Sequence, residues 1–461
     1  MKIHFVGIGG IAMGNLAFML KELGHEITGS DQNLYPPMST QLEKWNLHPK
    51  SGFDSKHVLG ADLVVIGNAI SRGNPEVEEV LNSRILYMSM AECIQKFLLK
   101  DKKVIVVSGT HGKTTTTFLI HYILSRLGLD PGLFVGGIRK DGFPGFAIGK
   151  GEYFVIEGDE YDSAFFDKSS KFLHYEPYYL LMTALDFDHA DIFRDVDAIK
   201  LMFSRLLKLV PSKGKVWFQE KSKHLKEVTD GYTLSRLEPY SLNEKSSLLH
   251  YKKGIVEFQK KRIHPNIFGN HNMLNAEVAL KVCLEIAPTK TQEILKAFEE
   301  FPGVKRRQEI LHTSEKSVLM EDFAHHPVAI HETILAVKNH FPDHKIISLF
   351  EPRSATSHRN VFQKDFAKSF AGSSSVVITE IYNPDKVPKK ERLNVKRLVS
   401  DTKKLSKADV HYAKNPEHIL EILDGLYKKY SSKKIIVLAM SNGAFGGIYP
   451  KLITSLKKRD L

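Results

Sequence analysis

The chain has 461 residues, which at roughly 150 residues per domain predicts about three domains, each long enough to bury a core. Hydrophobic residues make up 42% of the chain and charged residues 26%, a composition that excludes disordered, collagenous and low-complexity proteins. Lys and Arg outnumber Asp and Glu by 65 to 53, so the net charge of +12 indicates anionic partners without identifying them.

Cysteine content and the start of the chain indicate where the protein works. Cys93 and Cys283 are isolated, which predicts a reducing compartment and neither a disulfide framework nor a zinc site. The first residues, a lysine followed by mostly apolar positions, could pass for a targeting signal, but Gly7, Gly9 and Gly10 interrupt such a helix early. No stretch approaches the roughly 18 uncharged apolar residues that a membrane span needs. We expect a cytoplasmic protein without a membrane segment.

The first domain, predicted over residues 1–100, begins with a strand at 3–8 and a helix at 12–23 that ends at Gly24. Strand-like runs at 26–28 and 63–66 continue this alternation. A βαβ alternation of short apolar strands predicts a parallel, Rossmann-like sheet.

The central domain, predicted over residues 101–302, opens with a strand at 104–107, a Gly-rich turn and a helix at 114–127. Further strands are expected at 153–156 and 179–183. The stretch 217–263 has strand-like runs and turns, with a hairpin at 252–254, so the sheet is expected to be mixed. Two helices, at 272–287 and 291–301, are expected to end this domain.

The third domain, predicted over residues 303–461, repeats the alternation and is expected to be Rossmann-like. Its predicted strands are 318–320, 345–350, 376–379 and 435–439, and its predicted helices include 327–340 and 416–430. The fold class is therefore α/β with three domains, the central one resembling a P-loop ATPase.

The positive charge is concentrated in residues 386–407, where nine basic residues face only Glu391 and Asp401. The basic residues are Lys386, Lys389, Lys390, Arg392, Lys396, Arg397, Lys403, Lys404 and Lys407. A solvated loop and helix face explains such a run. A nucleic-acid site would interleave aromatic residues, which this stretch lacks, so we expect no nucleic-acid partner.

A phosphate-binding loop is the strongest motif, because a Gly-rich segment lies between an apolar strand and a helix. Its residues are Gly109, Thr110, His111, Gly112, Lys113, Thr114 and Thr115. Backbone N–H groups and the helix N-terminus favour phosphate, the lysine can reach the β- and γ-phosphates, and the first threonine offers a hydroxyl to Mg²⁺. The loop is shorter than the common P-loop spacing, so by spacing alone a structural turn remains the alternative.

A second Gly-rich turn lies at residues 7–12, directly after the first strand, with Ser30 and Asp31 about 20 residues further on. This arrangement is typical of a dinucleotide or nucleotide-sugar site that includes Gly9 and Gly10. Tight packing of a helix on the sheet is the structural alternative.

Two acidic turns follow strands of the central domain. Glu157, Asp159, Glu160 and Asp162 end one strand, and residues 186–191, with His189, follow another. Crowded carboxylates repel one another unless a cation lies among them, and Mg²⁺ prefers hard oxygen ligands. Acidic capping turns are the alternative for either cluster alone.

Three further segments follow the P-loop in the chain, and their order after it makes them candidate functional residues. Asn272 lies at the start of a helix, Arg307 in a basic turn, and Asp322 at a strand end shortly before His325. Taken separately they are a helix cap, a turn and a strand terminus.

Together these motifs resemble, in order and spacing, those of the Mur ligase family over essentially the whole chain. The segments are GTHGKTTT, EGDEYDSAFF, FDHADIF, NHNMLNA, GVKRRQ and EDFAHHP. The N-terminal GIGGIAMG and the EGDE form are similar to the branch that acts on UDP-N-acetylmuramate itself. Segments 35–40, 67–75, 350–354 and 440–447 look more like the enzymes of that branch that add a preformed tripeptide than like those that add L-alanine.

The resemblance implies an ATP- and Mg²⁺-dependent ligase that joins UDP-N-acetylmuramate to L-alanyl-γ-D-glutamyl-meso-diaminopimelate in peptidoglycan recycling. A carboxylate is a poor electrophile, so it would first be phosphorylated by ATP and the acyl phosphate then attacked by the free amine of the peptide. Phosphoryl transfer depends mostly on positioning and charge neutralisation, which suits the lysine and the carboxylates. The partners would be these small substrates, and the protein a monomer or weak homo-oligomer.

By position, the resemblance assigns roles to individual residues. Lys113 resembles the phosphate-binding lysine, and Thr114 and Glu157 resemble the ligands of one Mg²⁺ ion. His189 resembles a residue at a second metal ion or at the acyl phosphate. Contacts to the rest of ATP would come from Asn272, Arg307, Asp322 and His325. Substrate-binding residues would be Gly9, Gly10, Ser30, Asp31, Ser71, Arg353, Ser441 and Asn442.

One segment departs from the family. The family usually has Asn a few residues before the His of the second acidic turn, whereas this chain has Thr183 and Ala184 in that region. How the turn is held is left open by the sequence.

Three other functions compete with this interpretation. An L-alanine ligase of the main biosynthetic route would differ in the pocket of the third domain. A P-loop switch or motor that binds nucleic acid would explain the +12 charge, and a nicotinamide-dependent dehydrogenase would explain residues 7–12. Neither of the last two explains the paired acidic turns together with Asn272, Arg307 and Asp322.

Overall fold

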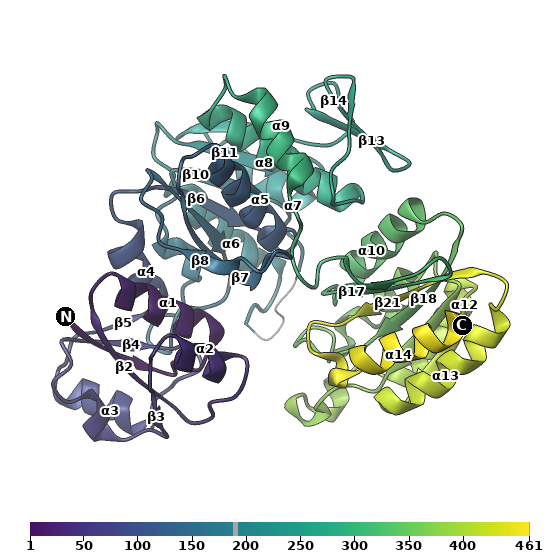
Figure 1. Ribbon diagram of the computed structural model, residues 1–461. Helices are drawn as coiled ribbons and strands as arrows, with labels where there is room; N and C mark the ends of the chain where they lie inside the picture. Colours follow the sequence, from purple (N-terminus) through teal and green to yellow (C-terminus); the bar gives the residue numbers. More distant parts are fainter. Residues whose placement is uncertain (188–191, 461) are drawn as a thin grey trace.

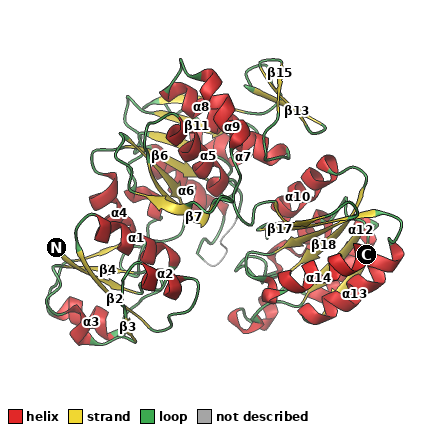
Figure 2. Ribbon diagram, in the orientation of Figure 1, coloured by secondary structure: helices red, strands yellow, loops and turns green. Residues whose placement is uncertain are grey.

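The computed structural model describes residues 1–187 and 192–460, which form three α/β units in chain order (Figure 1). Each unit is built on its own sheet, and helices lie beside the strands in each (Figure 2). The predicted α/β fold class is confirmed. No helix in the described part of the chain is long and apolar enough to cross a membrane.

The first unit is a five-stranded parallel sheet in the order β3-β2-β1-β4-β5. Its strands are β1 (Lys2–Val6), β2 (Glu26–Asp31), β3 (Lys50–Ser51), β4 (Leu63–Ile66) and β5 (Tyr87–Ser89). Its helices are α1 (Ile11–Glu22), α2 (Met38–Lys44), α3 (Pro75–Asn82) and α4 (Met90–Ile94). The strand predicted at 63–66 is β4, with the same bounds.

The central unit is a seven-stranded mixed sheet in the order β12-β11-β10-β6-β9-β7-β8, of which only β7 and β8 pair antiparallel. Its strands are β6 (Lys103–Ser108), β7 (Gly132–Ile138), β8 (Pro144–Ala147), β9 (Tyr153–Gly158), β10 (Tyr179–Met182), β11 (Lys215–Gln219) and β12 (Arg236–Tyr240). Its helices are α5 (Lys113–Arg126), α6 (Val196–Leu207), α7 (Lys223–Thr229), α8 (Asn270–Ile286) and α9 (Thr291–Glu300).

A separate three-stranded antiparallel sheet follows β12 and contains the predicted hairpin. It consists of β13 (Leu249–Lys252), β14 (Ile255–Phe258) and β15 (Lys261–Ile263). Lys253 and Gly254 form its first turn, both with positive φ. The prediction for 217–263 was incomplete, because the seven-residue helix α7 also lies there.

The third unit is a six-stranded sheet in the order β16-β17-β21-β18-β19-β20, in which only β16 is antiparallel. Its strands are β16 (Glu309–Thr313), β17 (Ser317–Asp322), β18 (His344–Phe350), β19 (Ser375–Thr379), β20 (Asp409–Ala413) and β21 (Lys434–Met440). Its helices are α10 (Pro327–His340), α11 (Gln363–Ser369), α12 (Val395–Ser406), α13 (Pro416–Lys429) and α14 (Tyr449–Asp460).

Apolar side chains of the strands pack into a hydrophobic core on each face of the third sheet. In β17, Val318 and Met320 belong to the core under α10 and α12, whereas Leu319 belongs to the core under α13 and α14. Successive side chains of a strand point to opposite faces, so a strand covered on both sides is apolar throughout. This accounts for the continuous apolar runs in the sequence.

The basic run at 386–407 contains α12. Lys396, Lys403 and Lys404 are exposed on this helix, while Val395 and Leu398 face the core. The burial pattern is that of an amphipathic helix with a solvated basic face.

Candidate active site

The predicted phosphate-binding residues lie at the carboxyl ends of three neighbouring strands, β10, β6 and β9. The loop 109–112 follows β6, the acidic turn with Glu157 ends β9, and Thr183 follows β10. In open α/β sheets ligands bind at this edge. The topology therefore brings together segments that lie up to about 70 residues apart in the chain.

The loop 109–112 has a backbone that requires glycine at two positions. Gly109 has φ +134° and Gly112 φ +82°, values that residues with a Cβ rarely adopt. A Cβ on Gly109 would lie 2.2 Å from Thr183 Oγ1, and one on Gly112 would lie 2.3 Å from Asn275 Oδ1. Gly112 is also the N-cap of α5, so the helix N-terminus opens directly onto the loop.

Lys113 is held inside this loop by an ion pair. Its Nζ donates to Gly109 O at 2.6 Å and lies 2.8 Å from Glu160 Oε2. Burial by itself lowers the pKa of Lys113, but the negative charges of Glu160, Asp159 and Glu157 raise it above the ordinary lysine value. The ammonium is therefore charged and aimed at the loop.

The side chains of Thr114 and Glu157 are joined by a hydrogen bond. Thr114 Oγ1 donates to Glu157 Oε1 at 2.9 Å, and Gly136 N donates to the other carboxylate oxygen at 2.9 Å. Burial raises the pKa of Glu157, while Lys113 opposes that effect. A hydroxyl and a carboxylate at a phosphate loop are the donor set that Mg²⁺ takes, with phosphate and water completing its shell.

Within residues 1–187 and 192–460, no group of three or more His, Cys, Asp or Glu side chains is arranged to hold a metal ion. A cation at Thr114 and Glu157 would thus depend on phosphate oxygens for the rest of its ligands. His189, predicted at a second metal ion or at the acyl phosphate, lies outside the described residues.

Thr183 and Thr110 hold the turn in which the family usually has Asn. Thr183 Oγ1 contacts Ser108 O at 3.0 Å and His111 O at 2.5 Å. Thr110 N donates to Ala184 O at 3.1 Å, and Thr110 Oγ1 accepts from Asp186 N at 3.2 Å. Among the described residues, the Thr183 and Thr110 hydroxyls and the Thr110 backbone thus connect residues 183–186 to the loop.

Asn272 and Asp322, from different units, meet at a residue that the sequence analysis missed. Asn272 Nδ2 donates to Gln308 Oε1 at 2.9 Å, and Gln308 N donates to Asp322 Oδ2 at 2.8 Å. Lys140 Nζ donates to Gln308 O at 3.0 Å. Gln308 is the last residue of the segment GVKRRQ, which the sequence analysis named without giving Gln308 a role.

Arg307 lies between the central and third units. Its guanidinium carbon is 4.4 Å from the centre of the Phe323 ring. Burial lowers the pKa of Arg307, whereas the charges of Asp322 and Glu157 act in the opposite direction, so the residue senses carboxylates of both units. His325 Nδ1 lies 3.0 Å from Phe323 O at the same junction.

The carboxyl edge of the third sheet carries the residues predicted to bind the peptide. Arg353 is stacked 3.7 Å over the centre of the Tyr382 ring and its Nη1 lies 3.8 Å from Glu351 Oε2. The hydroxyl of Ser441 is buried and donates to Glu351 Oε2 at 2.6 Å. Asn442 Oδ1 is buried without a hydrogen-bond partner among the described residues.

Arg306, named in the sequence only as part of a basic turn, connects the junction to this edge. Its Nε donates to Glu321 Oε1 at 2.9 Å, and its Nη2 donates to Ser441 O at 3.1 Å and Gly443 O at 2.6 Å. The loop after β21 is therefore fixed to the linker between the units.

The Gly-rich turn of the first unit is held by the end of β2. Gly7 N donates to Ser30 O at 2.9 Å, and Gly9 N donates to Asp31 Oδ2 at 2.8 Å. The side chain of Ser30 is buried behind the turn, whereas Gly10 and Ser71 are exposed beside it. These predicted residues gather at the carboxyl ends of β1, β2 and β4.

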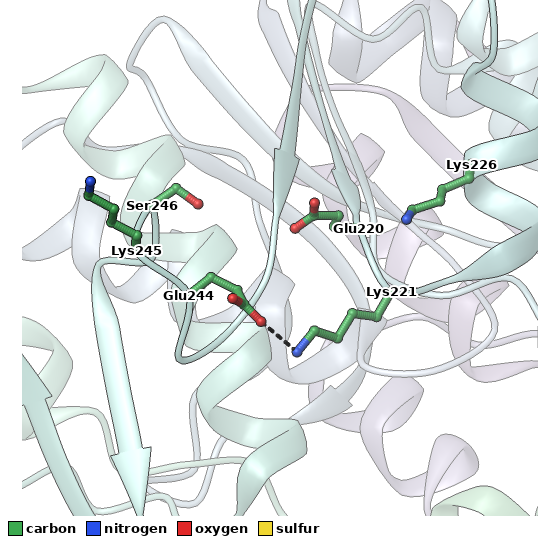
Figure 3. Close-up of a pocket in the computed structure, with 6 residues that line it drawn as sticks. All are labelled: Glu220, Lys221, Lys226, Glu244, Lys245 and Ser246. Atoms are coloured by element: carbon green, nitrogen blue, oxygen red, sulfur yellow. Dashed lines mark ion pairs between the residues drawn. The ribbon is translucent and has the colours of Figure 1, made fainter.

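A surface pocket of about 630 Å³ lies elsewhere, at the carboxyl ends of β11 and β12 (Figure 3). Its lining residues are Glu220, Lys221, Lys226, Glu244, Lys245 and Ser246. Lys221 Nζ and Glu244 Oε1 form an exposed ion pair at 2.9 Å. None of the predicted site residues lines this pocket.

We expect Gly112→Ala to impair the loop far more than Gly128→Ala, at the other end of α5. Gly128 also has positive φ, +76°, but a Cβ there meets nothing within 4 Å. Both variants should lose about 1 kcal/mol of stability from backbone strain, and only Gly112→Ala should also lose nucleotide-dependent activity. Thermal unfolding and phosphate-release assays check this, and equal activity of the two variants would contradict it.

Comparison with known proteins gives two matches to one family. Residues 2–102 match the domain described as "Mur ligase family, catalytic domain", and residues 107–283 match the "Mur ligase middle domain".

Individual relatives extend the likeness to the whole chain. The UDP-N-acetylmuramate–L-alanyl-gamma-D-glutamyl-meso-2,6-diaminoheptandioate ligase of Escherichia coli strain K12 is 35% identical, covering 100% of this chain and 99% of that protein. A UDP-N-acetylmuramate–L-alanine ligase of Caldanaerobacter subterraneus is 34% identical, covering 99% of this chain and 98% of that protein. The crystal structure of a murein peptide ligase from Psychrobacter arcticus 273-4 matches with a TM-score of 0.69 and 31% identity, over 99% of this chain and 98% of that one.

Proposed function

The chain belongs to the Mur ligase family, and on that premise we propose that it joins UDP-N-acetylmuramate to L-alanyl-γ-D-glutamyl-meso-diaminopimelate with hydrolysis of ATP. The names of the Escherichia coli and Psychrobacter arcticus relatives, both matched over nearly their full length, support the tripeptide as the amine substrate. The reaction belongs to peptidoglycan recycling in the cytoplasm. The protein acts as a monomer or weak homo-oligomer on small substrates, without nucleic acid or membrane.

The observation that carries the proposal is the arrangement of charges around the P-loop. Lys113 lies at the N-terminus of α5 and Glu157 at the end of β9, and Arg307, in the linker to the third unit, interacts electrostatically with Glu157. Lys113 and Arg307 can neutralise the charge of a triphosphate from two sides, and Glu157 can hold a cation that neutralises more of it. Charge neutralisation and alignment supply most of the catalysis of phosphoryl transfer.

We assign a role in this reaction to each of the predicted site residues. Lys113 binds the phosphates, and the loop residues Gly109, Thr110, His111, Gly112 and Thr115 surround them with backbone and hydroxyl donors. Thr114 and Glu157 would hold one Mg²⁺ ion, and His189 would act at a second metal ion or at the acyl phosphate. When bound, the ion would neutralise phosphate charge. Asn272 and His325 contact adenine, and Arg307 and Asp322 contact phosphate and ribose.

Ligation requires an activated carboxyl group, because a carboxylate resists attack by an amine. Transfer of the γ-phosphoryl group from ATP to the lactyl carboxylate of the sugar nucleotide forms an acyl phosphate and ADP. The free amine of the peptide then attacks the acyl carbon, and phosphate leaves. The protein's part is to align the groups and exclude water from the acyl phosphate.

We assign residues 1–100 to binding of the sugar nucleotide, 101–302 to ATP and 303–461 to the peptide. Gly9, Gly10, Asp31 and Ser71 surround the first site, where Ser30 contributes through its backbone. Arg353, Ser441 and Asn442 belong to the peptide site. An arginine fork suits a carboxylate of the peptide, which supports Arg353 in particular.

The amine substrate is tested by phosphate release in the presence of ATP, Mg²⁺ and UDP-N-acetylmuramate. We expect release with the tripeptide to exceed that with L-alanine by about 100-fold, because a site built for several polar groups discriminates against an amine that lacks them. Release with L-alanine alone would instead identify an L-alanine ligase, the alternative supported by the relative from Caldanaerobacter subterraneus. Turnover that needs DNA or RNA and no sugar nucleotide would contradict both.

A further inference from the structure

A buried carboxylate lies beneath the Gly-rich turn of the first unit, outside every residue discussed so far. Glu76, at the start of α3, is 0% exposed. Around it are apolar side chains of the core that α3 covers, including Val6, Val64 and Val77. An ionised group in such surroundings is costly unless hydrogen bonds compensate it.

Four donors from three other segments satisfy this carboxylate. Oε2 accepts from Ser30 Oγ at 2.5 Å and lies 3.3 Å from His4 Nε2. Oε1 lies 2.7 Å from His57 Nδ1 and accepts from Asp54 N at 3.3 Å. Burial raises the pKa of Glu76, but the hydrogen bonds outweigh burial, and the net pKa lies below the ordinary value. The group is therefore ionised.

Stability alone does not account for a charge at this position. Replacing a buried ionic cluster with well-packed apolar residues is often neutral or stabilising. In some proteins such a cluster instead fixes the arrangement of the segments that bond to it. Here those segments include the end of β2, because Ser30 is the residue that bonds most closely to Glu76.

The end of β2 in turn holds the Gly-rich turn. Ser30 O accepts from Gly7 N at 2.9 Å and from Ile8 N at 3.1 Å, and the next side chain, Asp31, accepts from Gly9 N at 2.8 Å. A shift of Ser30 would move these three hydrogen bonds together. Glu76 is thus linked to the turn through one residue.

We propose that Glu76 is a positioning residue for the sugar-nucleotide site, which fixes the Gly-rich turn and Asp31 through Ser30. The inference rests on the proposed binding of UDP-N-acetylmuramate by residues 1–100. Glu76 is fully buried and acts through Ser30, so its removal acts on the affinity for the sugar nucleotide, and it has no hydrogen bond to the P-loop among the described residues.

The test compares Glu76→Gln and Glu76→Leu with the wild type. We expect the KM for UDP-N-acetylmuramate to rise about tenfold, the effect of weakening hydrogen bonds to a charged group. The KM values for ATP and peptide and kcat should stay within about twofold, since those groups lie in other units. Glu79→Gln, on the same helix but partly exposed, is the matched control and should leave all constants unchanged.

Ser30→Ala tests the connection from its other end. It should raise the same KM. The double variant with Glu76→Gln should have a KM no higher than that of the more impaired single variant, because both changes break the same link. Equal rises in all three KM values, or an unchanged KM for the sugar nucleotide in folded Glu76→Gln, would overturn the inference. So would loss of folding in both Glu76 variants with normal kinetics for Ser30→Ala.

Calorimetric titration with UDP-N-acetylmuramate separates this inference from the function on which it rests. Wild-type protein that does not bind the sugar nucleotide would overturn the proposed function and the inference with it. Binding by the wild type and equal binding by Glu76→Gln would overturn the inference alone.

Discussion

Lys113→Ala should lower kcat for ligation by about 1,000-fold, because a positive charge placed at a developing phosphoryl charge accounts for an effect of this size. The ammonium lies in the P-loop, 2.6 Å from Gly109 O, with the charges of three nearby carboxylates keeping it protonated. Steady-state phosphate release with ATP, UDP-N-acetylmuramate and tripeptide measures the loss. Substantial remaining turnover would contradict the assignment of this loop to ATP.

The same substitution has a second effect, on stability. The Glu160 side chain is fully buried and would lose its lysine partner, which costs about 3 kcal/mol for a broken buried ion pair. Lys113→Ala combined with Glu160→Gln removes both charges, so it should recover thermal stability without recovering activity. Lys168→Ala is a matched control, because the exposed ion pair of Lys168 with Asp162 lies in the same region and contributes little.

Glu157→Gln should lower kcat by about 100-fold and raise the concentration of Mg²⁺ needed for half-maximal rate, because a neutral amide is a poor ligand for a hard cation. The shape of the side chain is preserved, and its contacts with Thr114 Oγ1 and Gly136 N, both 2.9 Å in the wild type, limit structural change. Titration of activity with Mg²⁺ measures both effects. Glu152→Gln, in an exposed pair with Lys103 just before β9, is the control.

If Glu157 holds Mg²⁺ as proposed, the concentration of Mg²⁺ that the wild type needs should also depend on pH. Burial raises the pKa of Glu157, so its carboxyl group binds a proton at a higher pH than an ordinary glutamate. A proton competes with the cation, so the apparent affinity for Mg²⁺ falls as pH is lowered toward that pKa. Glu157→Gln should lack this dependence. An identical pH dependence in the variant would show that another group controls metal binding.

The local pattern of the chain was sufficient to predict most of the elements that carry the site. The apolar run before the P-loop is β6, and the helix predicted at 114–127 is α5, displaced by one residue at each end. Gly109 and Gly112 are required by the backbone itself, so their role can be read from a short segment. Short polar elements such as α7 carried too weak a pattern to predict.

Residues that act through long-range contacts were not predictable in the same way. Gln308 joins Asn272 of the central unit to Asp322 of the third, and Glu160 pairs with a lysine 47 positions earlier in the chain. Glu76 is one glutamate among several on a surface helix in the sequence, and only burial distinguishes it. A hydrogen bond between distant segments leaves no periodic signal, because its partners are chosen by the packing of sheets and helices.

The sequence by itself determined the fold class, the order of the three units and the chemistry available at each strand end, because apolar periodicity and Gly-rich turns are local properties. Only the tertiary structure decided which of these strand ends lie together. Parallel pairing sets the carboxyl ends of β10, β6 and β9 at one edge, so Thr183, the loop 109–112 and Glu157 lie at that edge. The packing also set the local electrostatics: burial raises the pKa of Glu157, and neighbouring carboxylates raise the pKa of Lys113.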